Sequence, residues 1–172
     1  GIQRGSSTKP GKDGTFSGTS AWVLGINDNL YQNNTRAEFY TPMYDLSEPG
    51  LYELKFWSKF AIQNPHDGFQ VEYSTNGGAS WIQLGTRDNP NWYNYYNANL
   101  ADGAFPMGKS YFTNAQLTWT QYIKDISFLT GSTTVSFRYI FRSDDEEQAQ
   151  GFAIDNFEIT RYEGELETNV TV

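Results

Sequence analysis

The side chains best suited to chemistry are carboxylates near the ends of predicted strands. Asp144 begins an acidic run that ends at Glu147, Asp67 precedes another strand, and Asp155 lies within the last one. Calcium takes about six to eight oxygen ligands in flexible geometry, so carboxylates that converge with backbone carbonyls suit it. Asp67, Asp144 and Asp155 are therefore candidate metal ligands. The alternatives are a solvated acidic loop at 143–147 and a purely structural Asp155.

A second group consists of aromatic and amide side chains in the long segment 86–116. A sugar ring presents apolar C–H faces edged by hydroxyls, so a site for it needs flat aromatic platforms beside hydrogen-bonding groups. The alternative is that these rings pin the segment to the fold. We expect both roles to occur, with Trp92 and Tyr95 or Tyr96 exposed. The candidate ligand-binding residues are Trp92, Tyr93, Asn94, Tyr95, Tyr96 and Tyr111.

Catalytic chemistry finds little support in the residue pattern. The single histidine, His66, has no serine or cysteine nucleophile in its sequence context, and the Asn-Pro-His-Asp-Gly turn around it is typically structural. Cysteine is absent, which excludes disulfides and thiolate metal sites. No glycine-rich phosphate loop precedes a helix, and no Glu-x-Asp-x-x-Glu pattern of jelly-roll glucanases occurs. We therefore expect the chain not to be an enzyme.

Charge and hydropathy exclude two kinds of partner. Lys and Arg total 12 and Asp and Glu total 20, a formal net charge of -8. Such a surface repels phosphate backbones, so a nucleic acid is not expected to bind. No apolar run approaches the roughly 20 residues of a membrane-spanning helix, so membrane insertion is not expected either.

Alternation of apolar and polar residues predicts strands throughout, and helical spacing never persists beyond one turn. The clearest hairpin is 68–85, where Asn76 and Gly77 are expected to supply the positive φ angles of a tight turn and Trp81 to open the return strand. The two strands of this hairpin are expected at 68–75 and 80–85. Further strands are expected at 20–25, 36–41, 51–62, 117–125, 133–142 and 151–161.

These elements predict an all-β fold, a two-sheet antiparallel β-sandwich of the jelly-roll type, concanavalin-like or galactose-binding-like. Residues 1–19 are expected to form an extended N-terminal arm, 15–162 a single β-sandwich module and 163–172 an acidic C-terminal linker. A segment as long as 86–116 inside a compact domain is usually functional or disordered.

Short motifs follow one another in a recognisable order. They include Ser17-Gly-Thr-Ser-Ala-Trp22, Ser74-Thr-Asn-Gly-Gly-Ala-Ser-Trp81, Ser143-Asp144-Asp145 and Gly151-Phe-Ala-Ile-Asp155-Asn156. In this order the chain resembles MAM-like and cleaved-adhesin-like jelly-roll modules of secreted Bacteroidetes proteins. The resemblance implies an extracellular or cell-surface location and a calcium ion near Asp155. The acidic residue that related jelly rolls carry near their start has no clear counterpart before Asp13.

Two functions follow as hypotheses. The first is a non-catalytic, calcium-stabilised module that binds a polysaccharide or cell-surface glycan through aromatic platforms. The second is an adhesin or structural module that contacts other proteins, including the catalytic domain of a parent protease or glycanase. A jelly-roll enzyme that degrades polysaccharides is a third alternative. In each case the module is expected to be a monomer.

Overall fold

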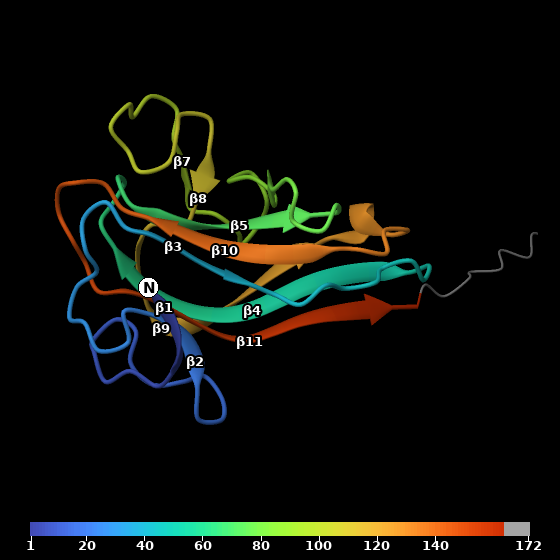
Figure 1. Cartoon of the computed structure of the whole chain (residues 1–172), viewed down its shortest axis with the longest axis horizontal. Helices are drawn as coiled ribbons and strands as arrows, with labels where there is room; N and C mark the ends of the chain where they lie inside the picture. Colours follow the sequence, from blue (N-terminus) through green and yellow to red (C-terminus); the bar gives the residue numbers. More distant parts are fainter. Residues whose placement is uncertain (164–172) are drawn as a thin grey trace, which may run out of the picture.

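Two antiparallel sheets stacked face to face make up most of the computed structural model, which describes residues 1–163 (Figure 1). The five-stranded sheet contains, in order across it, β1 (Ile2–Gly5), β2 (Ala21–Leu24), β11 (Gly151–Tyr162), β4 (Leu51–Ile62) and β9 (Asn114–Asp125). The four-stranded sheet contains β3 (Arg36–Tyr40), β10 (Ser136–Arg142), β5 (Gly68–Ser74) and β6 (Ile82–Gln83). A separate short pair joins β7 (Tyr95–Tyr96) to β8 (Ser110–Tyr111).

This architecture confirms the predicted all-β sandwich. The one helical element in residues 1–163 is a 3-10 turn, η1 (Ser127–Leu129), and no helix there is long and apolar enough to cross a membrane. The segment predicted as an extended arm contains an edge strand, β1, which is too short to show an alternating pattern. Of the predicted C-terminal linker, all but residue 163 lies outside the described residues.

The predicted hairpin is present, but its turn is built differently. Positive φ angles occur at Gly77 (70°) and Gly78 (86°), not at Asn76. Asn76 instead accepts hydrogen bonds through its side-chain Oδ1 from the Ser80 backbone N–H (3.0 Å) and the Ser74 hydroxyl (2.8 Å). The side chain thus ties the two arms together, and glycine supplies the left-handed backbone.

Aromatic rings from both sheets and from the segment 86–116 fill the space between the sheets. Phe56 of β4 is fully buried at the centre of this cluster. Its ring centroid lies 5.2 Å from that of Tyr139 on the facing sheet and 5.4 Å from that of Tyr122 on β9. Trp92 and Phe112, from the two ends of the long segment, approach it at 5.8 and 6.2 Å. The long segment is therefore part of the core.

The middle of the same segment covers one end of the outer face of the four-stranded sheet. Ile140 points outward from β10 and is buried under Phe105 and Tyr111. Figure 1 shows β7 and β8 standing above β5, whereas the N-terminal segment lies on the opposite side, beneath the five-stranded sheet. There Lys12 is buried and donates from Nζ to the Leu24 carbonyl at 2.7 Å.

Replacing Phe56 by alanine tests the position of the core. We expect Phe56→Ala to lower the free energy of unfolding by about 3–5 kcal/mol, because it leaves a cavity among rings of both sheets. Leu117→Ala, at a side chain that is 60% exposed, is the control and should change it by less than about 0.5 kcal/mol. Urea denaturation measures both values. Equal losses for the two variants would contradict this packing.

Candidate functional site

The structure divides the predicted aromatic ligand residues into a buried set and an exposed set. Trp92 is only 4% exposed, and its indole Nε1 donates to the Leu84 carbonyl at 2.8 Å. The expectation that Trp92 is exposed is therefore wrong. The ring instead packs beside Phe56 and Phe112 between the sheets, the pinning role that the sequence left open. A tryptophan in a loop fills the core when its N–H finds a buried acceptor.

Tyr93 and Tyr111 are buried as well, and their hydroxyls are used internally. The Tyr93 hydroxyl donates to the Val71 carbonyl at 2.8 Å, and the Tyr111 hydroxyl donates to the Pro65 carbonyl at 2.8 Å. Burial raises the pKa of both phenols above the ordinary value of a tyrosine. These rings anchor the long segment to β5 and to the turn before it, so neither offers a platform to a ligand.

The exposed set is smaller. Asn94 lies at the surface, but its amide donates to the Thr113 carbonyl (2.7 Å) and accepts from the Thr113 N–H (2.9 Å). Tyr95 is half-buried against Tyr111, with the ring centroids 5.2 Å apart. Tyr96 is 48% exposed. Of the six predicted residues, Tyr96 therefore presents the most open ring.

Beside Tyr96 lies a cavity of about 420 Å³, which we call the Tyr96 pocket. Gln83 of β6 forms part of its wall, and its Oε1 accepts from the Ser110 N–H at 3.1 Å. Arg87 and Asp88 lie at the surface, and their side chains make no hydrogen bond or ion pair within residues 1–163. The pocket is lined by Gln83, Thr86, Arg87, Asp88, Tyr96, Gly108 and Ser110. It combines one aromatic ring with two charged side chains that have no partner within residues 1–163.

Two of the three candidate metal ligands lie together, in a network that contains hydrogen-bond donors. Asp67 is buried, and its two oxygens accept from the Tyr31 hydroxyl and from the Asp144 backbone N–H, each at 2.7 Å. The Asp144 carboxylate lies 3.0 Å from His66 Nδ1 and accepts from the Glu146 N–H at 2.9 Å. Donors occupy the positions that further oxygen ligands would need around a calcium ion.

Asp155 has a different role. Its Oδ2 accepts from the backbone N–H groups of Phe16 (2.9 Å) and Ser17 (3.0 Å), and Oδ1 accepts from the Asn156 N–H (2.7 Å). The carboxylate thus holds the loop after the N-terminal segment on β11. Within residues 1–163, no group of three or more His, Asp or Glu side chains is placed to hold a metal ion, so the predicted trio is not assembled.

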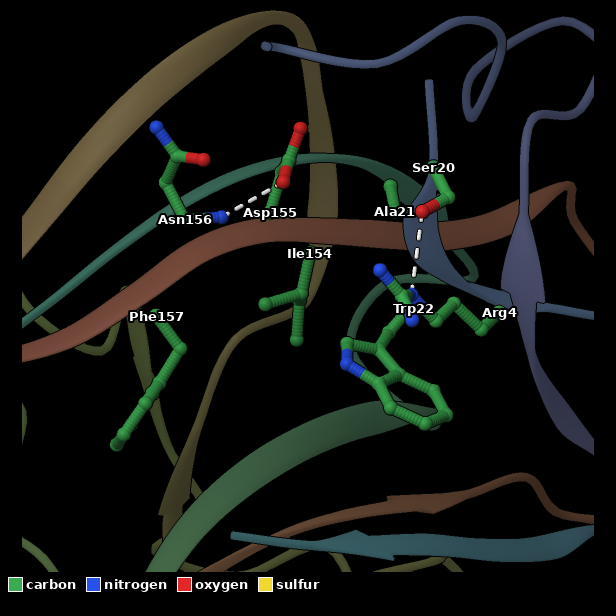
Figure 2. Close-up of a pocket in the computed structure, with 8 residues that line it drawn as sticks. All are labelled: Arg4, Ser20, Ala21, Trp22, Ile154, Asp155, Asn156 and Phe157. Carbon is green, nitrogen blue, oxygen red and sulfur yellow. Dashed lines mark hydrogen bonds between the residues drawn. The ribbon is translucent and has the colours of Figure 1, made fainter. Parts of the chain in front are cut away.

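A further cavity, of about 320 Å³, opens at the sandwich edge and was not predicted from the sequence. Figure 2 shows Trp22, Ile154 and Phe157 on one side of β11, with the side chains of Asp155 and Asn156 projecting to the other side. Trp22 is 38% exposed and stacks on a ring of the facing sheet. The nearby polar groups are already bonded, since Arg4 Nε donates to the Ser20 hydroxyl at 3.1 Å. This cavity offers an apolar wall and few free polar groups.

Fold and site together define the class of protein, an antiparallel β-sandwich module with a surface pocket built on a long insertion. Residues 12–160 match the family described as Reelin subrepeat B, and the chain belongs to that family. Among solved structures, the K1 cleaved adhesin domain of Lys-gingipain from Porphyromonas gingivalis W83 is similar, with a TM-score of 0.49 and 18% identity over 94% of this chain and 84% of that chain. No curated protein matches the chain. The predicted MAM-like relationship stays a prediction.

The buried Asp67 predicts a pH dependence of stability. Burial is the largest cause that raises the pKa of this carboxyl from 3.8 to about 6, and the hydrogen bonds from Tyr31 and Asp144 oppose it. Between about pH 4 and pH 6 the folded protein therefore holds a proton that the unfolded chain has released. The stability that Asp67 contributes is full at acid pH and is lost as the pH rises through 6.

The variant Asp67→Asn cannot titrate and should lose this dependence. We expect the free energy of unfolding of the wild type, minus that of Asp67→Asn, to fall by up to about 3 kcal/mol between pH 4 and pH 7. Urea titrations at several pH values measure this difference. A difference that rises over the same range would mean that the pKa of Asp67 is lowered in the folded state, contrary to this account.

Proposed function

We propose that the protein is a non-catalytic binding module whose ligand is a carbohydrate held in the Tyr96 pocket. The observation that carries this proposal is the joint presence there of an open tyrosine ring and two charged side chains, Arg87 and Asp88, that have no partner within residues 1–163. A side chain that has no internal partner can bind a ligand without first breaking an internal hydrogen bond.

The chemistry of a sugar matches this arrangement. The apolar C–H face of a pyranose packs on an aromatic ring, and its hydroxyls both donate and accept hydrogen bonds. Asp88 can accept two such bonds, and Arg87 can donate several. The volume of about 420 Å³ falls within the roughly 300–1,000 Å³ of small-ligand sites. A pocket of this volume is suited to one or two sugar units and not to a long stretch of a polysaccharide.

A binding role is better supported than hydrolysis. Glycoside hydrolysis in most families requires two carboxyl groups about 5 to 9.5 Å apart across the bond to be cleaved. The lining of the Tyr96 pocket includes one, that of Asp88. The single histidine, His66, is not among the residues that line this pocket; its Nδ1 lies 3.0 Å from the Asp144 carboxylate.

The family supports an accessory role. Its description names a subrepeat, a unit of a larger repetitive protein, which is consistent with a module that works beside other domains. We propose on this basis that the module is secreted or displayed at the cell surface, where glycans are abundant. It would hold a parent protein, including any catalytic domain, close to a polysaccharide and so raise the local concentration of that polymer.

A second candidate function is contact with another protein. Tyr40 and Met43, each 56% exposed, line a shallow cavity of about 350 Å³ together with Trp81 and two glycines of the hairpin turn. The Trp81 ring is held in place by the Arg138 guanidinium, 4.7 Å from its centroid. Aromatic, Met and Arg side chains are enriched at protein interfaces. This cavity shares no lining residue with the Tyr96 pocket, so both functions can coexist.

The glycan proposal is tested by Tyr96→Ala and Asp88→Asn. Affinity electrophoresis on neutral and acidic polysaccharides, followed by calorimetry with oligosaccharides of any polymer that retards the protein, should detect binding by the wild type. We expect each variant to weaken it by about tenfold, since a stacked ring or a charge-assisted hydrogen bond contributes about 1–2 kcal/mol. Tyr40→Ala, an exposed tyrosine outside the pocket, is the matched control. No retardation on any polymer, or equal loss in all three variants, would refute the proposal.

Calcium remains a separate proposal, limited to Asp67 and Asp144. The surrounding donors do not fit an ion as they stand, because the Tyr31 hydroxyl would have to turn away from Asp67. If calcium binds the folded state, EDTA should lower the melting temperature and excess calcium should restore it, by mass action. Asp144→Asn should abolish the effect. An unchanged melting curve in EDTA would remove calcium from the account, without bearing on the glycan pocket.

A further inference from the structure

Two arginines face each other on the outer side of the four-stranded sheet. Arg36 of β3 and Arg142 of β10 are directly paired in register. Like charges at directly opposed cross-strand positions destabilise a sheet. The arrangement is unexpected in a chain with a net charge of -8, where acidic residues outnumber basic ones and could have occupied either position.

The other cations on this face are neutralised, which makes Arg142 distinct. Arg138 pairs with Glu72 and, at 3.1 Å, with Glu38. Glu38 also accepts from Arg36 Nε at 2.7 Å. Arg142 makes no hydrogen bond or ion pair with any residue in the described part of the chain, and its Nε is buried without a partner. Burial, and then the charge of Arg36, lower the pKa of the Arg142 guanidinium.

The neighbouring strand β5 offers Arg142 no acidic side chain at the position paired with it. On the other side of Arg142 the cross-strand partner is Gly68, which has no side chain. A Cβ at Gly68 would lie 2.4 Å from a ring atom of Tyr111, so glycine is required there. The Phe105 ring packs against the guanidinium, with 5.4 Å between its centroid and Cζ. Nε is the one buried, unpartnered atom of Arg142, so its terminal nitrogens are left toward solvent, beside Arg36.

We propose that Arg36 and Arg142 form a binding site for a carboxylate, the acid group of an acidic sugar. A guanidinium presents parallel N–H donors that match the two oxygens of a carboxylate. A bound carboxylate would offset the charge of Arg142 and give its unpaired guanidinium the missing acceptor. Strong polyanions are a poorer match, because the net charge of -8 repels them at long range.

The anion site stands independently of the Tyr96 pocket. It is built on β3 and β10, whereas the pocket lies at β6, the opposite edge of the same sheet. The inference that the carboxylate belongs to a sugar rests on the proposed function. The inference that Arg142 binds a carboxylate does not. A neutral glycan held beside Tyr96 and an acidic sugar held at Arg142 are therefore separable events.

The test uses the whole chain and titrates it with sodium galacturonate, galactose, sodium acetate and sodium sulfate against sodium chloride at matched ionic strength. Melting temperature and NMR chemical shifts report binding. We expect galacturonate to raise the melting temperature and shift the Arg142 and Arg36 side-chain signals, and galactose to do neither at these arginines. Arg142→Gln and Arg36→Gln should each weaken galacturonate binding at least tenfold. Arg4→Gln, an exposed arginine of the other sheet, should leave it unchanged.

The outcomes separate cleanly. If acetate binds at these arginines as tightly as galacturonate, the carboxylate site is supported and the sugar assignment is overturned. If galacturonate stabilises Arg142→Gln as much as the wild type, as sulfate does, the stabilisation is a general salt effect and the arginine site is overturned. Galacturonate binding that is lost in Tyr96→Ala but kept in Arg142→Gln overturns the arginine site and leaves the glycan proposal standing. If Arg142→Gln fails to fold, Arg36→Gln decides, because the Arg36 side chain is 54% exposed and its replacement leaves no cavity.

Discussion

The structure depends on filling the gap between its two sheets with aromatic rings. Phe56 contacts rings from the facing sheet, from the edge strand β9 and from the long insertion, so the insertion is a third wall of the core. Aromatic side chains bury about 150–250 Å² each, and a chain without disulfides relies on that area for its stability. Packing in the core, and not a ligand, therefore holds Trp92 and Phe112 in place. Their positions restrict where the rest of the insertion can lie.

The surface sites follow from this anchoring. Because both ends of the insertion are held in the core, its middle folds back over the outer face of the four-stranded sheet, where Tyr111 and Phe105 bury Ile140. One side of this cover forms the Tyr96 pocket against β6. The other side meets Arg142 through the Phe105 ring. The same packing therefore places an open tyrosine ring beside two charged side chains at one edge of the sheet, and the Arg142 cation towards the other edge.

The strands could be predicted because alternation depends on local sequence. The long strands β4, β5, β10 and β11 lie where the pattern places them, and the all-β class follows from them. The burial of Trp92 could not be predicted, because an aromatic-rich loop has the same composition whether its rings face the core or the solvent. The sequence also could not decide which residues of the hairpin turn adopt a positive φ angle, because asparagine and glycine both tolerate one; the structure has it at Gly77 and not at Asn76. The facing of Arg36 and Arg142 depends on register between strands about a hundred residues apart.

The central position of β11 bears on how the chain acquires its structure during synthesis. β11, the last strand of the five-stranded sheet to be synthesised, is inserted between β2 and β4, which have no other shared neighbour in that sheet. Until it arrives, β2 and β4 each present an unpaired edge, and the loop at Phe16 lacks the Asp155 carboxylate that holds it. Exposed edges of this kind recruit other strands. Folding of this sheet must therefore end at its middle, and a truncated or stalled chain is the form most exposed to aggregation.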